Sequence, residues 1–246
     1  MGRAYIGTSG WSYRSWEGTF YPPRLPKTHQ FDHYASCFPT VEINLTFYRL
    51  PTLKMVQNWR DRAPSGFVYA IKGSRFITHM KKLLNVREAL REFFRCLDPL
   101  RRRVSVVLWQ LPPFLSIDIP RLESFLKLLP KAYDHAVEFR HPSWLTRDVF
   151  AVLRQHRAAH VSVSSLAMPV DLTVTSDLVY IRFHGLEAGA AHDYSQAELE
   201  PWATHIRKQA RAGKTVYAYF NNDVNARAPS NARTMMNLVG LAPDDV

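Results

Sequence analysis

Short apolar runs rich in β-branched and aromatic residues recur along the whole chain. Runs of this length, either alternating with polar residues or continuously apolar, are typical of strands buried in a sheet. Eight segments have this character, at residues 5–9, 40–45, 67–73, 104–111, 135–140, 160–165, 178–184 and 215–221. The pattern therefore predicts eight strands.

Most segments between these strands carry apolar residues at helical spacing, together with start and stop signals. One example is Ser195 with Glu198, which has the spacing of a capping box. The predicted helices cover a segment after Thr28 that ends before Pro39, and residues 52–62, 90–97, 121–129, 147–157, 195–211 and 230–239. Strand and helix thus alternate along the chain.

This alternation predicts an α/β fold with a parallel sheet, because each parallel pairing needs a crossover connection. Eight such units fit a single (β/α)₈ TIM-like barrel better than an open sheet. No repeat or Gly/Ser linker divides the chain, so we expect one domain over residues 1–246. Residues 166–177 are too few and too polar for a crossover helix. The barrel is therefore expected to be irregular, with no full helix between strands six and seven.

Side chains along a strand alternate between its two faces, so residue parity separates the barrel interior from the helix-covered face. The predicted helix-facing set is apolar and consists of Val41, Ile43, Leu45, Val137, Phe139, Val161, Val163, Val179, Ile181, Phe183, Val216, Ala218 and Phe220. The opposite parity is polar and consists of Glu42, Asn44, Lys72, Gln110, Glu138, Arg140, Ser162, Ser164, Arg182, His184, Tyr219 and Asn221. We expect this second set to face the interior.

The polar set gathers at the carboxyl ends of the strands, where barrels of this class hold their active sites. Glu42 and Glu138 are candidates for general acid and base, and His184 for a proton shuttle. Charged and amide side chains suited to an anionic ligand are Lys72, Arg140, Arg182, Asn44, Gln110 and Asn221. Aromatic residues that follow strand ends, for stacking on a ligand or for covering the barrel, are Trp11, Tyr48 and Trp144.

Other interpretations of the same residues stay open. Glu42 and Glu138 also fit a buried ionic network with the three cations, since unpaired buried charges are costly. Lys72 also offers an amine for a Schiff base with a carbonyl. A divalent metal among Glu42, Glu138 and His184 is chemically reasonable, but the neighbouring cations argue against it. The chain has no G-x-G-x-x-G or P-loop motif, so the sequence does not support a nucleotide cofactor, and the identity of any cofactor is unknown.

Several strand-end motifs resemble those of the DUF72 (YecE-like) family. They lie at residues 7–13 (GTSGWSY), 40–44 (TVEIN), 110–113 (QLPP), 138–144 (EFRHPSW), 182–185 (RFHG) and 219–223 (YFNND). The resemblance extends over essentially the whole chain and implies a TIM-like barrel, while it leaves the chemistry open. One departure is Ser164-Ser165, where the resemblance leads us to expect an acidic residue.

Composition narrows the class of protein without naming a function. The 246 residues are 46% hydrophobic and 22% charged, which is typical of a folded globular protein. The longest apolar stretch, near residues 104–115, is too short and too polar to span a bilayer, so no membrane partner is expected. Cys37 and Cys96 lack the spacing of a metal or disulfide framework. A strand-like run begins at Ala4, so we expect no secretory leader before it. The cysteine spacing and this early strand favour a cytoplasmic protein with reduced, buried thiols.

The formal net charge of +11 favours anionic partners. The leading hypothesis is an enzyme, a hydrolase, isomerase or lyase, that acts on a small anionic or sugar-like molecule at the barrel mouth. One alternative is nucleic-acid binding by the basic segment 81–103, where Arg87, Arg91 and Arg95 share a helix face. Pairing with Glu88 and Glu92 favours a solvated face instead. The other alternative is a ligand-binding barrel without catalysis.

Overall fold

The computed structural model describes residues 2–241 and shows a closed barrel of parallel strands in the order β1 to β8. The strands are β1 (Ala4–Ser9), β2 (Thr40–Ile43), β3 (Val68–Lys72), β4 (Val104–Gln110), β5 (Asp134–Glu138), β6 (Ala159–Ser164), β7 (Leu178–Phe183) and β8 (Thr215–Phe220). The first strand pairs with both β2 and β8, which closes the barrel. The predicted (β/α)₈ class is confirmed.

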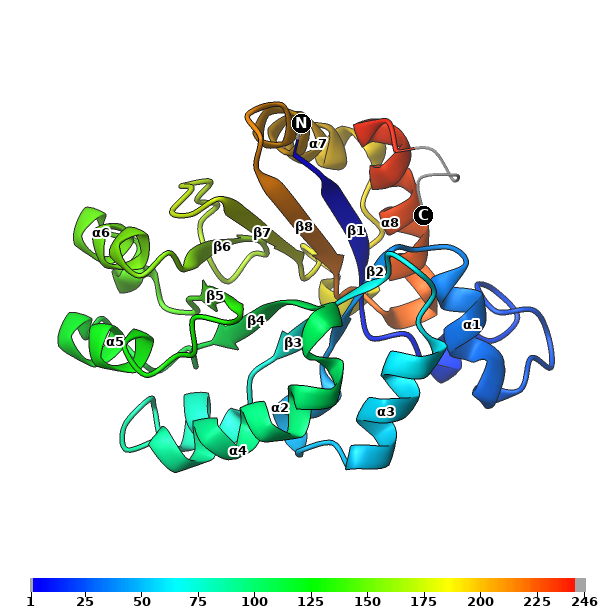
Figure 1. Ribbon diagram of the computed structural model, residues 1–246. Coiled ribbons are helices and arrows are strands. Elements are labelled where there is room, and N and C mark those ends of the chain that lie inside the picture. Colours follow the sequence, from blue (N-terminus) through cyan, green and yellow to red (C-terminus); the bar gives the residue numbers. More distant parts are fainter. Residues whose placement is uncertain (1, 242–246) are drawn as a thin grey trace.

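Helices lie around the outside of the barrel, in most of the connections between strands and after the last strand (Figure 1). They are α1 (Gln30–Ala35), α2 (Leu45–Tyr48), α3 (Leu53–Arg62), α4 (Arg87–Leu97), α5 (Ile119–Leu126), α6 (Arg147–Gln155), α7 (Gln196–Arg211) and α8 (Arg227–Val239). The hydroxyl of Thr52 caps α3 by accepting a hydrogen bond from the Met55 N–H. Ser195 and Glu198 form the predicted capping box of α7. Side-chain oxygens thus satisfy backbone donors that the first turn leaves free.

The region after β2 differs from the prediction. The strand ends at Ile43, and Asn44 already has helical dihedral angles, so that Leu45 begins α2 and does not continue the strand. A π-helical turn, Phe76–Met80, follows β3 and was likewise not predicted. Both segments lie at the carboxyl end of the barrel, beside the strand ends that carry the polar residues.

The connection from β6 to β7 contains no helix, as its length and polarity predicted. The predicted parity of β6 is wrong, however. Val161 lies opposite Tyr180 and Val163 opposite Arg182, and parallel partners point to the same face. Since Arg182 faces the interior, Val161 and Val163 do so too.

Ser162 and Ser164 therefore face the helices rather than the interior. The hydroxyl of Ser164 lies 2.9 Å from the Tyr194 hydroxyl, which also accepts the Gly185 N–H. Assigning parity by polarity failed here because an outward serine with a hydrogen-bond partner costs little, whereas the interior at this level takes valine.

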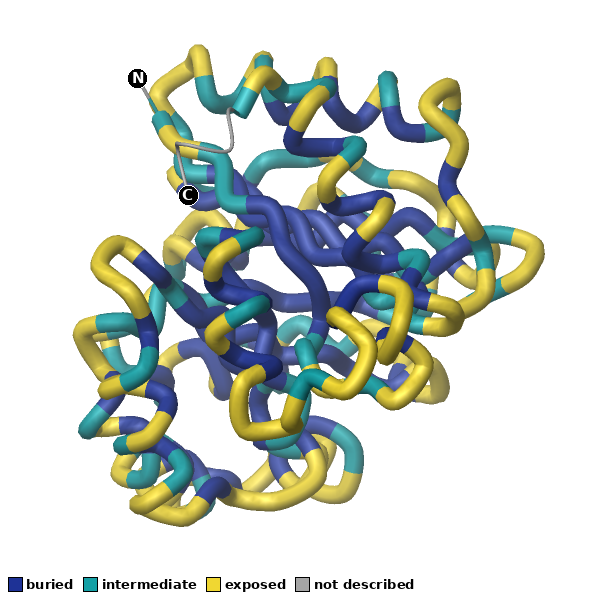
Figure 2. Tube along the Cα trace, turned by 90° about the vertical axis from the view of Figure 1, so that its right-hand side faces the viewer, coloured by how far each residue is buried: buried dark blue, intermediate teal, exposed yellow. Residues whose placement is uncertain are grey.

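The buried side chains form two layers. One fills the space between strands and helices, and a smaller cluster fills the barrel itself. In Figure 2 the strands form the dark, buried centre, while exposed residues lie mainly in the connections and on outer helix faces. The barrel cluster combines small and aliphatic residues such as Ala70 and Leu108 with Tyr180, Tyr217 and Tyr219. Charged groups appear above this cluster, toward the carboxyl ends of the strands.

Two other predictions concern thiols and membranes. Cys37 and Cys96 are both free, as expected, but each is partly exposed rather than buried. Among residues 2–241, none of the helices is long and apolar enough to cross a membrane.

Candidate functional site at the barrel mouth

A buried chain of three ions crosses the barrel at the carboxyl ends of its strands. Arg182 of β7 donates from Nη2 to Oε1 of Glu42 on β2 over 2.7 Å, and from Nη1 to Oε2 of Glu138 on β5 over 2.6 Å. All three residues are fully buried. Charges removed from water persist only when they are paired and hydrogen-bonded, so one guanidinium ties three strands together.

Glu42 keeps its charge because donors surround it. Ser9 Oγ donates to Oε1 over 2.7 Å, and the Tyr180 hydroxyl donates to Oε2 over 2.6 Å. Burial would raise the pKa of Glu42, but the charges of Arg182 and Lys72 and the hydrogen bonds from Tyr180 and Arg182 lower it below its usual value. Glu42 is therefore a carboxylate at neutral pH.

Glu138 is held in the same way from another side. Gln110 donates to Oε1 over 2.9 Å, Arg140 Nε donates to the same oxygen, and His184 Nε2 lies 3.2 Å away. Burial opposes ionisation, but Arg140 and Arg182 outweigh it and hold the pKa of Glu138 well below its usual range. A carboxyl group with a lowered pKa does not donate a proton at neutral pH, so the general-acid role predicted for one of the pair fits neither glutamate.

His184 directly follows β7 and contacts both the Glu138 network and Asn221 at the end of β8. Arg140 Nη2 donates to its Nε2 over 2.8 Å, and the Asn221 amide lies 3.3 Å from its Nδ1. Burial, together with the charge of Arg182, lowers the pKa of His184 to about 4. The ring is therefore neutral at physiological pH and has no imidazolium proton to give.

Lys72 is the last residue of β3. Unlike Arg140 and Arg182, its cation does not contact a carboxylate of the described residues. Among residues 2–241, its Nζ makes no hydrogen bond or ion pair, and it lies 4.3 Å from the ring centroid of Phe47. Burial, reinforced by Arg182, lowers the pKa of Lys72 to about 8. An amine with this pKa is still mainly protonated at pH 7, but its neutral fraction is larger than that of an ordinary lysine.

The backbone at Lys72 is fixed on both sides. The Thr46 hydroxyl donates to the Lys72 carbonyl over 2.6 Å, and the Gly73 N–H donates to Leu108 over 2.8 Å. A Cβ on Gly73 would lie 2.3 Å from the Trp109 ring, so only glycine fits beside that indole. The strand end that carries Lys72 is therefore rigidly placed.

The remaining predicted residues fall into two groups. Asn44 and Asn221 are partly exposed at the strand ends, and Asn44 Oδ1 is buried with no hydrogen-bond partner among residues 2–241. Tyr48 is 69% exposed, and Trp11 packs edge-on against other aromatic rings. Trp144 is fully buried, stacks on another ring and donates to the Leu115 carbonyl, so it has no free face for a ligand. We leave Trp144 out of the proposed site.

Sequence reasoning missed three contributors to this site, Ser9, Tyr180 and Phe47. Ser9 and Tyr180 have interior parity, since Ser9 pairs with Glu42 and Tyr180 precedes Arg182 by two residues. That parity was an available signal. Phe47 depends on the unpredicted helix α2 and had no such signal. Within residues 2–241, no group of His, Cys, Asp and Glu side chains has the arrangement to hold a metal ion.

Comparison with known proteins agrees with this architecture. Residues 5–246 match the family described as "Protein of unknown function DUF72". The chain belongs to the DUF72 family. The UPF0759 protein YunF of Bacillus subtilis is 24% identical over 278 residues, which cover 97% of each chain. The UPF0759 protein YecE of Escherichia coli is 33% identical over 144 residues, or 58% of this chain and 50% of YecE.

A solved DUF72 family protein of Thermotoga maritima superposes on this chain with a TM-score of 0.87 and 28% sequence identity, over 96% of this chain and 99% of that one. These names state no substrate.

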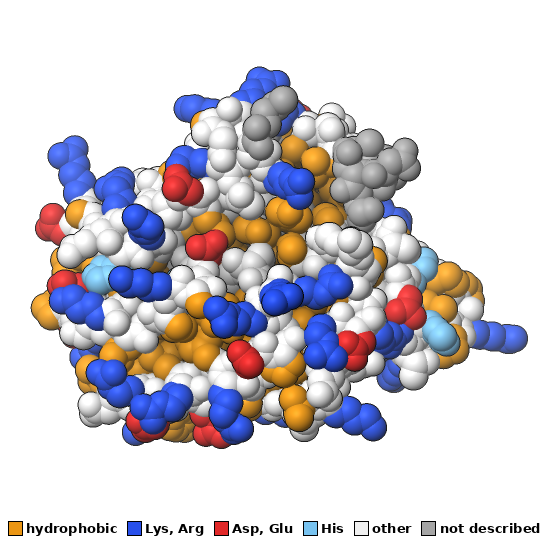
Figure 3. All heavy atoms as spheres, in the orientation of Figure 1, with side chains coloured by type: hydrophobic (Ala, Val, Ile, Leu, Met, Phe, Trp, Pro, Cys, Tyr) orange, Lys and Arg blue, Asp and Glu red, His pale blue; other side chains and the backbone are white. Residues whose placement is uncertain are grey.

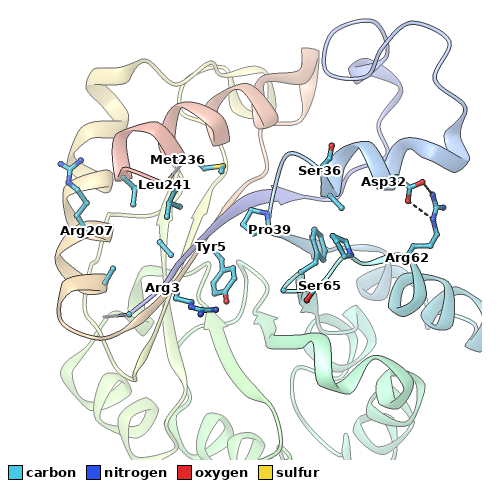
Figure 4. Close-up of a pocket in the computed structure, with 18 of the residues that line it drawn as sticks. Arg3, Tyr5, Asp32, Ser36, Pro39, Arg62, Ser65, Arg207, Met236 and Leu241 are labelled. Carbon is cyan, nitrogen blue, oxygen red and sulfur yellow. Dashed lines mark hydrogen bonds and ion pairs between the residues drawn. The ribbon is translucent and has the colours of Figure 1, made fainter. Parts of the chain in front are cut away.

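A separate groove of about 1150 Å³ lies at the opposite, amino-terminal end of the DUF72 barrel, beside the start of β1 and next to α1, α3, α7 and α8 (Figure 4). Its size alone does not make it the better candidate. Arg62 in its wall is paired with Asp32 at 2.6 Å, and Arg207 with Glu200 at 2.8 Å. The groove lacks the convergent buried charges of the mouth, so we favour the mouth.

The basic helix α4 of this DUF72 chain carries exposed ion pairs. Arg91 lies 2.7 Å from Glu88 and Arg95 lies 3.4 Å from Glu92, as the helical spacing suggested. On the face seen in Figure 3, Lys and Arg side chains are dispersed among apolar and acidic ones and do not form a continuous stripe. This arrangement matches a solvated helix face.

Proposed function

We propose that this DUF72 protein is an enzyme that acts on a small anionic molecule at the carboxyl-end mouth of its barrel. The observation that supports this most is the balance of charge. Lys72, Arg140 and Arg182 face only two carboxylates, and His184 is neutral. One positive charge is left over among the described residues, and it belongs to the Lys72 amine, which no carboxylate of residues 2–241 contacts. An anion would complete the site.

The proposed roles follow from the partners of each group. Lys72 Nζ and Arg140 Nη1, neither of which has a hydrogen-bond partner among residues 2–241, bind the anion. Glu42 and Glu138 remain ionised and orient the arginines. His184, held neutral, orients the substrate through its ring nitrogens. The amides of Asn44 and Asn221 would bind hydroxyl or carbonyl groups, which suits an isomerase or lyase acting on a sugar-like or organic acid.

Thermal unfolding with a panel of small molecules tests the proposal. The panel contains inorganic phosphate, pyruvate, gluconate and ribose 5-phosphate, with neutral ribose for comparison, all at one ionic strength. The variants are Lys72→Met and, as a matched control, Lys54→Met, which removes an exposed lysine of α3. A ligand at about 100 times its Kd adds ~2.7 kcal/mol, which for a chain of this size raises Tm by roughly 5–11 °C.

We expect at least one anion to raise Tm in the wild type and in Lys54→Met, and to lose its effect in Lys72→Met. Ribose should have no effect. Following that anion by NMR in the presence of protein then separates turnover from binding without catalysis. Equal shifts in all three proteins, or none with any anion, would contradict a small-anion site at the mouth.

A further inference from the structure

The Lys72 amine differs from the arginines beside it in what it can do chemically. Both guanidinium groups are committed to carboxylates, Arg182 through two bonds of 2.6 and 2.7 Å and Arg140 through Nε. Lys72 Nζ lies at the same strand ends but is free of such bonds among residues 2–241, and its neighbour is the face of Phe47. A simple counter-ion for Glu42 or Glu138 would be expected to contact one of them.

The surroundings of Lys72 increase the fraction of neutral amine that is in equilibrium with the charged form. Desolvation by burial is the largest cause of its lowered pKa of about 8, and Arg182 and Arg140 add to it, while Glu42 and Glu138 oppose it. Lysines beside a second cation or in an apolar pocket are activated as nucleophiles, because the neutral form carries the reactive lone pair. Geometry and charge therefore both prepare this nitrogen for covalent chemistry.

We infer that Lys72 Nζ forms a Schiff base with the carbonyl carbon of a small oxo acid, an inference that rests on the proposed anion site. Arg140 Nη1, which has no partner among the described residues, would bind the acid group of the same molecule. The oxo acid satisfies both halves of the site, since its carbonyl carbon meets the amine and its carboxylate supplies the missing negative charge.

The chemical step balances without a further reactant. The Nζ lone pair attacks the carbonyl carbon, the C=O π electrons move to oxygen, and a proton passes from nitrogen to that oxygen. The carbinolamine then takes one proton from solvent and loses water as the nitrogen lone pair forms the C=N bond. The iminium product withdraws electrons from the adjacent carbon and makes a proton on that carbon more acidic.

Reductive trapping tests the inference on the full chain. The protein is incubated with pyruvate, glyoxylate, 2-oxobutyrate or 2-oxoglutarate, then reduced with sodium borohydride, and the modified lysine is located by peptide mass spectrometry. Lactate, which has the acid group without the carbonyl, is the chemical control. Lys54→Met is the matched protein control for Lys72→Met.

We expect one reduced adduct per chain with at least one oxo acid, on Lys72, present in Lys54→Met and absent in Lys72→Met and with lactate. Replacing Arg140 by Met should lower the yield at a fixed oxo acid concentration by roughly tenfold or more, the value of a hydrogen bond to a charged group. Circular dichroism checks that each variant is folded.

Two failures are distinguishable. If no adduct forms on Lys72, while small anions still raise Tm in a Lys72-dependent way, the covalent step is wrong and the anion site stands. If neither an adduct nor a Lys72-dependent Tm shift is found, both proposals are wrong. Equal labelling of Lys72 and exposed lysines also overturns the inference.

Discussion

Two regions of this protein pair arginine with glutamate, and they differ in almost every other respect. At the barrel mouth, Arg182 contacts Glu42 and Glu138, and all three are fully buried. On α4, Arg91 lies 2.7 Å from Glu88, which is also the distance from Arg182 to Glu42, but the side chains of Arg91 and Glu88 are 71% and 75% exposed. The same distance therefore joins partners in a water-poor interior in one case and in solvent in the other.

The comparison shows that burial, not contact distance, decides what an ion pair does. Exposed pairs contribute about 0–1 kcal/mol and are screened by salt. A buried pair has given up its hydration, so removing one partner leaves the other charge stranded. The mouth network is therefore a rigid framework that presents Lys72 and Arg140, whereas the exposed α4 pairs contribute little to stability.

The largest effect is expected for Arg182→Met. This change leaves Glu42 and Glu138 buried without their shared cation, so the free energy of unfolding should fall by about 3–5 kcal/mol. Equilibrium unfolding in urea measures it. The matched change on α4, Arg91→Met, should cost less than about 0.5 kcal/mol. Comparable losses in the two variants would contradict the distinction between the regions.

The second effect concerns pH. His184 is buried with a pKa of about 4, whereas an unfolded histidine titrates near 6.5. Below pH 6.5 the unfolded state binds the extra proton, so stability falls as pH drops toward 4. One histidine contributes at most about 1.4 kcal/mol per pH unit. His184→Asn should flatten the curve in this window.

Below that window the glutamates add to the loss of stability. Their pKa values are lowered in the folded protein, so their contribution is present above the unfolded value and disappears as pH falls through the folded one. Urea unfolding from pH 7 to 3 measures both parts. A wild-type stability that stays constant from pH 6.5 to 4 would contradict the buried neutral His184.

A third, smaller effect is expected for Tyr180→Phe. The substitution removes the hydroxyl that donates to Glu42 over 2.6 Å and changes little else. A hydrogen bond to a buried charge is worth about 1.5–3 kcal/mol. Thr234→Val, which removes an exposed hydroxyl on α8, serves as control. Urea unfolding again reports the difference, and a loss no larger than that of the control would show that Tyr180 does not support Glu42.

The smallest expected effect is a difference in how salt changes the stability contributed by the ion pairs of the two regions. Raising the sodium chloride concentration shortens the Debye length from about 10 Å at 0.1 M to about 3 Å at 1 M. The energetic cost of Arg91→Met should then vanish, while that of Arg182→Met should be nearly unchanged, because solvent ions do not enter the buried site. Unfolding of both variants at the two salt concentrations checks this, and a strong salt dependence of the Arg182 variant would argue for a hydrated mouth.

Much of the fold was accessible from sequence because strand and helix patterns are local. Apolar runs located all eight strands, and Ser195 with Glu198 marked the start of α7. The parity of β6 was not accessible, since Ser164 is satisfied outside the barrel by Tyr194, which lies 30 residues away in the chain. Tertiary hydrogen bonds of this kind leave no local pattern.

The candidate site was predicted as a set of residues but not as a set of roles. Strand-end parity brought Glu42, Glu138, Arg182 and His184 together correctly. Their protonation states depend on burial and on exact partners, which sequence does not contain. It took the structure to show that both glutamates stay ionised and that the Lys72 amine has no hydrogen-bond or ion-pair partner within residues 2–241.

The most direct measurement of the central claim is the protection of Lys72 from acetylation. Wild-type protein is acetylated with acetic anhydride in the presence of phosphate, pyruvate, gluconate or ribose 5-phosphate at constant ionic strength, and each lysine is followed by mass spectrometry. We predict that at least one anion slows acetylation of Lys72 while exposed Lys54 reacts at an unchanged rate. If Lys72 reacts equally fast with every anion present, or is protected only together with Lys54, the mouth is not an anion site.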